Sequence, residues 1–158
     1  METKNYKTMI GISIFAALLC IVSIGWIISQ SYYILMTADE CNLWHEDLYP
    51  IQYTIFYGRL IFKSLFYLLI IAFLFKQLKA IKNGVLFPRG NVKILYGMAL
   101  SYFIGNTCDE NVSTALLFDN RGSLVLNSDT WIYVALLIVF ALIYKVAVSV
   151  SEENNLTI

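Results

Sequence analysis

Long apolar runs, separated by shorter polar segments, dominate the pattern of the chain. The first run extends from Met9 to Ile28 without a charged residue, and a helix of about 20 residues crosses a hydrocarbon core of ~30 Å. Runs of similar length cover 55–75 and 131–150, and another begins near Asn91. We therefore predict an all-α integral membrane protein that forms one domain over residues 1–158. Its four transmembrane helices are expected at about 8–30, 55–76, 91–108 and 131–150.

The composition favours the same class of protein. The 158 residues are 59% hydrophobic and 14% charged, with a mean hydropathy of +0.68, whereas about 25% of the residues of a typical soluble domain are charged. These values do not fit an ordinary water-soluble globule, so the lipid bilayer is the first expected partner. Eleven Lys and Arg residues balance eleven Asp and Glu residues, so the net charge gives no information about nucleic acid. As partners we expect no directly bound nucleic acid.

Basic residues divide the connections between the runs into two kinds. Lys4 and Lys7 precede the first run, and a group that we call the basic loop links the second run to the third. The basic loop contains Lys76, Lys79, Lys82, Arg89 and Lys93. The other two connections contain eight acidic residues and Arg121. Because short loops rich in Lys and Arg stay in the cytoplasm, we expect both termini to be cytoplasmic.

Two interpretations of the basic loop stay open. Positive charges near a membrane surface attract anionic lipids by ~1 kcal/mol each, and in this interpretation the loop only sets the topology. In the other interpretation the loop docks a cytoplasmic protein, together with the acidic tail at Glu152 and Glu153, which we expect on the same face. After the loop, Asn91 is predicted to cap the next helix by accepting a hydrogen bond from a free backbone N–H.

The segments on the opposite side are longer than tight connections. Residues 37–54 and 108–130 are expected to form a small acidic cap outside the membrane. Within this cap the turn sequence Asp119-Asn120-Arg121-Gly122 lies between apolar triplets at 116–118 and 124–126. Two apolar segments around such a turn are typical of a short β-hairpin.

Two cations lie inside the second run. Arg59 and Lys63 are spaced i, i+4 and so share a helical face. Because a charge in lipid is costly, they are expected to face the other helices. The third run reaches a comparable depth at Asp109 and Glu110, which we predict as their partners, with the polar residues 106–107 nearby. This intramembrane charge cluster either fixes the helix register or forms a polar pocket, open to the outer side, where an anion or a proton changes the pairing.

Three cysteines and one histidine offer few chemical sites. Cys20 lies in the first run as a small apolar residue. Cys41 and Cys108 lie just beyond helix ends on the oxidising side, where they either form a disulfide or stay as two buried thiols. His45 has one cysteine nearby, but a structural zinc site needs four ligands in regular spacing. We expect no metal.

No catalytic template matches the chain. A glycine-rich phosphate loop, a Ser-His-Asp set and a His-Glu-x-x-His motif are all missing from the sequence, so we expect neither an enzyme nor a cofactor. Two classes of function remain. One is a regulatory or sensory membrane protein with a cytoplasmic partner, and the other is a small-solute or ion pathway, which would need a homo-oligomer because four helices leave little room.

Two stretches of the chain resemble a known family. Residues 84–97 read Gly-Val-Leu-Phe-Pro-Arg-Gly-Asn-Val-Lys-Ile-Leu-Tyr-Gly, and residues 151–158 read Ser-Glu-Glu-Asn-Asn-Leu-Thr-Ile. They are similar to the loop-and-helix signature and the acidic ending of the bacterial four-helix membrane proteins catalogued as domain of unknown function 2975. The resemblance implies a bacterial inner membrane and a cytoplasmic regulator, of the helix-turn-helix kind, as the partner. It therefore favours the regulatory hypothesis.

Overall fold

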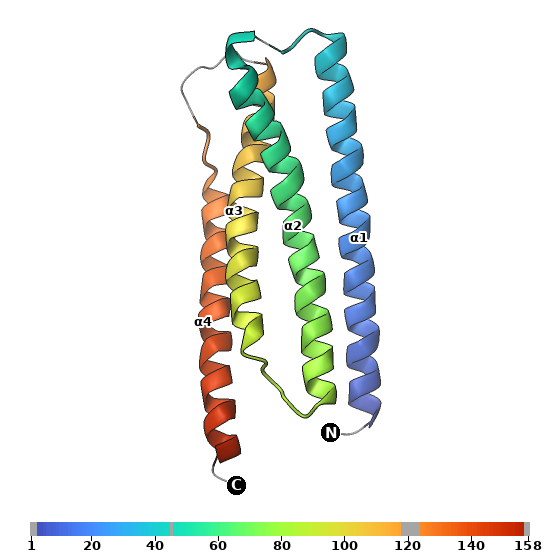
Figure 1. Ribbon diagram of the computed structural model, residues 1–158, viewed down its shortest axis with the longest axis vertical. Helices are drawn as coiled ribbons and strands as arrows, with labels where there is room; N and C mark the ends of the chain where they lie inside the picture. The colour runs from blue at the N-terminus through green and yellow to red at the C-terminus, as the bar shows by residue number, and fades with distance from the viewer. Residues whose placement is uncertain (1–2, 45, 118–123, 157–158) are drawn as a thin grey trace.

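Four long helices make up most of the described chain (Figure 1). The computed structural model describes residues 3–44, 46–117 and 124–156. Its elements are α1 (Thr3–Glu40), the 3-10 turn η1 (Glu46–Leu48), α2 (Tyr49–Lys82), α3 (Gly90–Leu117) and α4 (Ser128–Leu156). Pro50 stands in the first turn of α2, where a missing backbone N–H costs nothing. The expectation of an all-α chain with four helices is confirmed.

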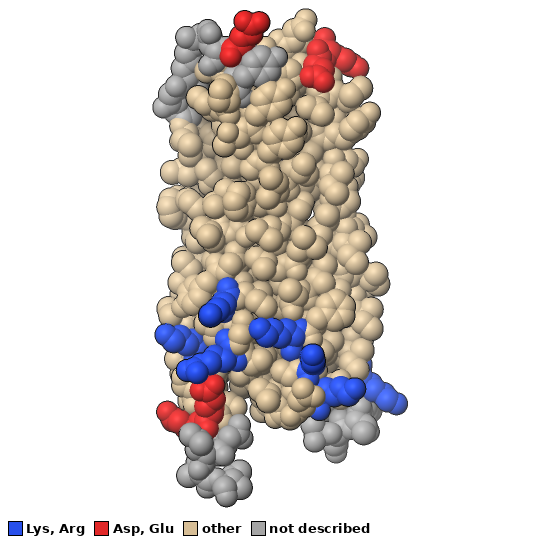
Figure 2. Space-filling model, viewed as in Figure 1, with Lys and Arg blue, Asp and Glu red and all other residues tan. Residues whose placement is uncertain are grey.

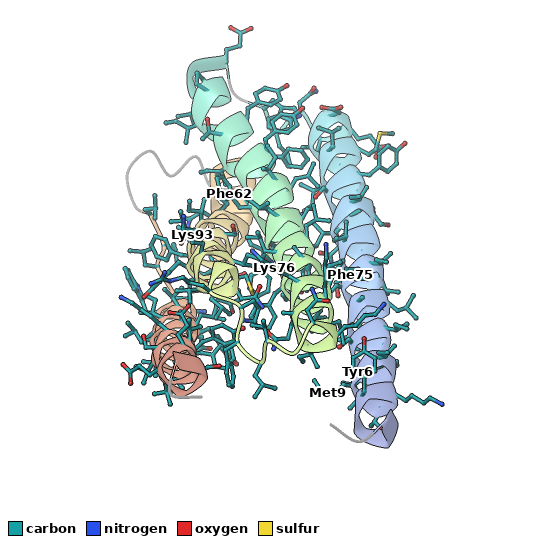
Figure 3. All side chains as sticks on the ribbon, turned by 60° about the horizontal axis from the view of Figure 1, so that its bottom comes forward. Tyr6, Met9, Phe62, Phe75, Lys76 and Lys93 are labelled. Carbon is teal, nitrogen blue, oxygen red and sulfur yellow. The ribbon has the colours of Figure 1, made fainter. Side chains whose placement is uncertain are left out.

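The helices form an open, antiparallel arrangement. Substantial packing in the described chain joins sequence neighbours: α1 with α2, α2 with α3, and α3 with α4. Two views show α1 and α4 at the edges, with α2 and α3 between them (Figure 1, Figure 3). The beginning of α1, the link between α2 and α3, and the end of α4 lie at one end of the molecule (Figure 1). We call this the basic end, because it carries the basic loop.

Three helices of the described chain are long and apolar enough to cross a membrane. These segments are Tyr6–Glu40, Pro50–Lys82 and Ser128–Glu153. The third expected span, in α3, is 28 residues long but less apolar. α3 packs between α2 and α4. The polar side chains of Asn91, Ser101 and Asn111 are accordingly buried in the protein.

The connections opposite the basic end are shorter than the acidic cap that we expected. Most of 37–54 and 108–130 extends the four helices, since α1 continues to Glu40 and α3 to Leu117. Residues 116–117, expected in a hairpin strand, are the last turn of α3, and 124–127 form no strand. The turn at 119–122 lies outside the described residues. The prediction of a hairpin is therefore wrong for the residues that the structure describes, because α3 continues through the first half of the segment.

A line of small residues on α3 lets α2 approach closely. Gly97, Ser101 and Gly105 are spaced i, i+4 and share one face of the helix. A methyl group at Gly105 would lie 2.9 Å from the backbone nitrogen of Lys63 in α2, and one at Gly97 would lie 3.4 Å from a methyl group of Leu69. Close backbone approach strengthens the van der Waals packing that holds membrane helices together. It accounts for the extensive contact between α2 and α3.

Gly105→Ala is expected to lower the free energy of unfolding by about 1–3 kcal/mol, because the added methyl group must push the α2 backbone away. Gly25→Ala in α1 is the matched control, since nothing lies within 4 Å of a methyl group at that position. The measurement is the denaturation midpoint of each variant in detergent micelles, followed by circular dichroism. Equal midpoints for the two variants would contradict the close contact.

Candidate functional site

Arg59 of α2 binds two neighbouring helices at once. Its side chain is only 4% exposed, and its Nε donates to Oδ1 of Asp109 on α3. Its two terminal nitrogens donate to Ser31 Oγ at 2.7 Å and to Gln30 Oε1 at 2.9 Å, both on α1. A guanidinium group is planar and holds its donors in a fixed fork. Arg59 therefore sets the position of α1 and of α3 relative to α2.

Lys63 shares the carboxylate of Asp109 with Arg59. It lies one helical turn after Arg59 and donates to Oδ2 of Asp109, so both carboxylate oxygens carry an ion pair. Gly105 precedes Asp109 by one turn, and the close approach at this glycine brings Asp109 within reach of both cations. The structure thus brings together Arg59, Lys63 and Asp109, as the sequence predicts.

The cluster of these three residues has an excess of positive charge. Two cations pair with one carboxylate, so a formal charge of +1 remains from the +2 of Arg59 and Lys63 and the −1 of Asp109. A buried charge without a partner is costly in surroundings of low dielectric constant. The cluster therefore differs from a neutral salt bridge whose charges cancel.

Glu110 does not join the cluster, contrary to the expectation. Its carboxylate accepts hydrogen bonds from the backbone nitrogen of Asn127 at 3.0 Å and from Thr130 Oγ1 at 2.6 Å. Both donors lie at the beginning of α4, where backbone N–H groups lack helical partners and the helix dipole favours a negative charge. Successive side chains of a helix diverge by roughly 100°. Asp109 consequently faces α2, while Glu110 faces α4.

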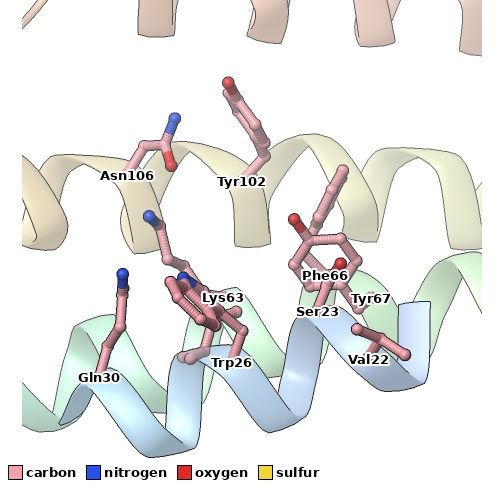
Figure 4. Close-up of a pocket in the computed structure, with 10 residues that line it drawn as sticks. Val22, Ser23, Trp26, Gln30, Lys63, Phe66, Tyr67, Tyr102 and Asn106 are labelled. Atoms are coloured by element: carbon pink, nitrogen blue, oxygen red, sulfur yellow. The ribbon is translucent and has the colours of Figure 1, made fainter. Parts of the chain in front are cut away.

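A groove of about 520 Å³ lies beside Lys63, between α1 and α3 (Figure 4). Its polar lining residues are Ser23 and Gln30 of α1, Lys63 and Tyr67 of α2, and Tyr102 and Asn106 of α3. Apolar and aromatic side chains, including Trp26 and Phe66, complete the lining. Asn106 therefore lies near the cluster as expected. Thr107 does not contribute, because its buried hydroxyl has no hydrogen-bond partner among the described residues.

The cysteines that were candidates for a disulfide are free thiols. Cys108 lies on α3 against α2, where a methyl group at Gly58 would come within 2.8 Å of its sulfur. Cys41 is exposed just beyond the end of α1. The disulfide is therefore absent, and only one of the two thiols is sheltered. His45 lies outside the described residues, and no metal-binding group of His, Cys, Asp and Glu occurs among those described.

A second polar contact joins α2, α3 and α4 near the basic end. Asn91 is fully buried, and its side-chain nitrogen donates to Gln77 Oε1 at 2.9 Å and to Tyr144 Oη at 3.3 Å. The Tyr144 hydroxyl donates to Gln77 Oε1 at 2.7 Å, and Gln77 donates to the carbonyl of Leu86 at 2.6 Å. The expectation that Asn91 caps α3 is wrong. The helix begins at Gly90, and the Asn91 side chain bridges helices instead.

The basic loop exposes all five of its cations. They are Lys76, Lys79, Lys82, Arg89 and Lys93. The Arg89 side chain is 83% exposed, and its Nε lies 4.0 Å from an oxygen of Glu152 on α4. Figure 2 shows Lys and Arg side chains gathered at this end, with an uncharged belt over the middle of the visible face. The basic loop and the acidic tail share one face, as expected.

Uncharged polar residues are the functional groups that reasoning from charges alone misses. Ser31 and Gln30 bind Arg59, while Gln77 and Tyr144 bind Asn91. The sequence did carry a signal for these residues, since polar residues inside apolar runs usually face other helices.

Comparison of the chain with models of protein families, with curated proteins and with solved structures gives no match. The function is therefore argued from the geometry of the chain itself.

Arg59→Glu is expected to reduce strongly the amount of folded protein, because it places a second carboxylate beside Asp109. Loss of one partner from a buried ion pair costs about 3–5 kcal/mol. Adding Asp109→Arg exchanges the two charges and should restore part of the loss. The measurement is the yield of monodisperse protein in size-exclusion chromatography.

Glu110→Arg, added to Arg59→Glu, is the matched control for this exchange. Glu110 is adjacent in sequence but faces α4, so this second combination should give no recovery. Recovery with Glu110→Arg and none with Asp109→Arg would show that the pairing is wrong.

Proposed function

We propose that the protein is a small non-enzymatic protein of the bacterial cytoplasmic membrane, which crosses the bilayer four times and keeps both termini inside. The length and apolar character of α1, α2 and α4 support three of these crossings. α3 crosses with them, because it packs alongside α2 and α4 and buries its polar side chains against protein. The basic loop lies at the end that holds both termini (Figure 1), and positive loops stay in the cytoplasm.

The cytoplasmic face of this protein docks a regulatory protein. The observation that carries this proposal is the exposed basic loop, which lies next to the acidic end of α4 through Arg89 and Glu152. Anionic lipid would attract the cations but repel Glu152 and Glu153. A protein with complementary charges of both signs matches the whole surface better, and such complementarity gives specificity. The resemblance of 84–97 and 151–158 to domain of unknown function 2975 supports a helix-turn-helix partner.

A small-solute or ion pathway is less well supported. The polar contacts of Asp109 and of Asn91 lie at different levels of the bundle. Between them lies an apolar cluster that includes Leu95, Met98 and Ala141. A route through one protomer would have to cross this cluster. The arrangement of polar groups in the described chain therefore favours a regulatory protein.

Reporter fusions test the proposed crossings. Fusions at Lys82 and after Ile158 are expected to give cytoplasmic signals, and a fusion at Trp44 is expected to give an external signal, because the basic loop stays inside. Alkaline phosphatase and green fluorescent protein, placed in turn at each position, provide reciprocal readouts. An external signal at Lys82 would overturn the orientation.

Charge reversal in the basic loop tests the docking of a partner. The double variant Lys79→Glu, Lys82→Glu is expected to lower several-fold the recovery of partner protein in affinity purification from native membranes. The difference should shrink as salt is raised, because salt screens exposed charges. Recovery of a DNA-binding protein with the parent chain would support the regulatory function.

Lys7→Glu is the control for this variant, since Lys7 is exposed at the beginning of α1 and lies outside the basic loop. The reporter fusions establish that both variants keep their topology. If the double variant keeps its topology and recovers as much partner protein as the parent chain, these lysines serve only to set the topology.

A further inference from the structure

The excess positive charge of the cluster faces the groove between α1 and α3. Arg59 is enclosed by its partners, whereas Lys63 has 22% of its side chain exposed and lines the groove. A lysine ammonium group has three N–H donors. One of them is bound to Asp109, and the other two have no partner in the part of the chain that the structure describes. Lys63 therefore presents donors and charge to whatever enters the groove.

The residues around Lys63 suit an anion. Gln30 and Asn106 bring side-chain amides that can donate hydrogen bonds, and Tyr102 brings a hydroxyl group. Figure 4 shows the Lys63 side chain extending from α2 toward Asn106 on α3. None of the described residues that line the groove is acidic. One negative charge at this position would complete the neutralisation of the cluster.

The remaining lining of the groove is apolar and open to the surroundings of α1. Val22 and Trp26 lie within the apolar span of α1, and Trp26 is 65% exposed. Phe66 lines the groove from α2. The volume of about 520 Å³ falls within the ~300–1,000 Å³ typical of small-molecule sites. A small inorganic ion would leave the apolar part empty, whereas an amphiphile could enter sideways from the lipid and fill it.

We propose that this groove binds the monovalent anionic head group of an acyl-chain amphiphile. The head group is held by Lys63, Gln30 and Asn106, and the acyl chain lies along Val22 and Trp26. A fatty-acid carboxylate and a monoanionic phospholipid head group share this chemistry. The ligand connects α1 with α3, two helices that otherwise pack mainly on α2. The inference rests on the proposed membrane crossing and is independent of the cytoplasmic partner.

Fluorescence quenching of Trp26 by brominated acyl chains tests the proposal. The chain has 3 Trp residues, so Trp44→Phe and Trp131→Phe leave Trp26 as the only reporter in the full-length protein. In micelles of a neutral detergent, a brominated fatty acid is expected to quench this fluorescence saturably. The brominated alcohol of the same chain length should quench it weakly and without saturation. Equal, saturable quenching by acid and alcohol would overturn the proposal.

Two further titrations identify the source of the head group. The titration with brominated phosphatidylglycerol is compared with the titration with the brominated fatty acid. The amphiphile that quenches with the lower apparent Kd is the one that the site prefers. Acetate is tested as a competitor, because it carries the carboxylate without an acyl chain. Displacement of the brominated acid by acetate at an equal concentration would show that a small anion suffices, and the proposal would be wrong.

Two groove variants separate ligand binding from structural stability. Lys63→Met leaves a neutral pair of Arg59 and Asp109, so the fold should persist while saturable quenching weakens at least tenfold. Asn106→Asp supplies the missing negative charge from the protein and should weaken binding to a similar extent. Lys7→Met, at the exposed beginning of α1 and outside both the groove and the basic loop, is the control and should bind like the parent. Unchanged binding in both groove variants would overturn the proposal, while the reporter fusions reveal separately any failure of the membrane crossing.

Discussion

The buried guanidinium group of Arg59 is the contact on which the arrangement of the first three helices depends. In a bilayer the hydrophobic effect does not draw helices together, so close packing and polar contacts must hold them. Arg59 supplies such contacts to α1 and α3 simultaneously, through Ser31, Gln30 and Asp109. A further contact of the same kind lies nearer the end opposite the basic end, where Gln52 of α2 donates to backbone carbonyl groups beyond α1 and in α3. α1 also packs along α2, and these polar bonds fix its register within that packing.

Like α2, α3 packs against a helix on each of two sides. Its small residues admit the backbone of α2, and its carboxylates face opposite neighbours, with Asp109 toward α2 and Glu110 toward α4. Asn111 adds a bond to the connection before α4, since its side-chain amide pairs with both backbone groups of Val125. The same features that make α3 less apolar than its neighbours therefore attach α4 to the other helices.

The parts of this structure that follow from counting along the chain could be predicted from the sequence. Helix length and depth depend only on the rise per residue, and they bring Asp109 level with Arg59 and Lys63. Rotation of α3 about its own axis could not be derived in this way, and it decides that Asp109 rather than Glu110 meets the cations. Sequence reasoning offered a polar pocket at the charge cluster as one alternative, but the lining of the groove could not be derived, because it depends on which helices fail to pack against each other. Asn91 was misjudged because its helix begins at Gly90, two residues earlier than a cap at this position requires.

The shared carboxylate of Asp109 has a consequence for biosynthesis. Asp109 follows Lys63 by 46 residues, so α2 leaves the ribosome with two cations before their acidic partner exists. Each Lys or Arg at the centre of a helix opposes insertion by about 2.5–3.5 kcal/mol, and α1 offers only neutral groups in compensation. We therefore expect α2 alone to insert less readily than α1 or α4, whose candidate spans are more apolar. We expect the α2–α3 hairpin to enter the bilayer as one unit, because the small-residue face of α3 lets this pair close before α4 is complete.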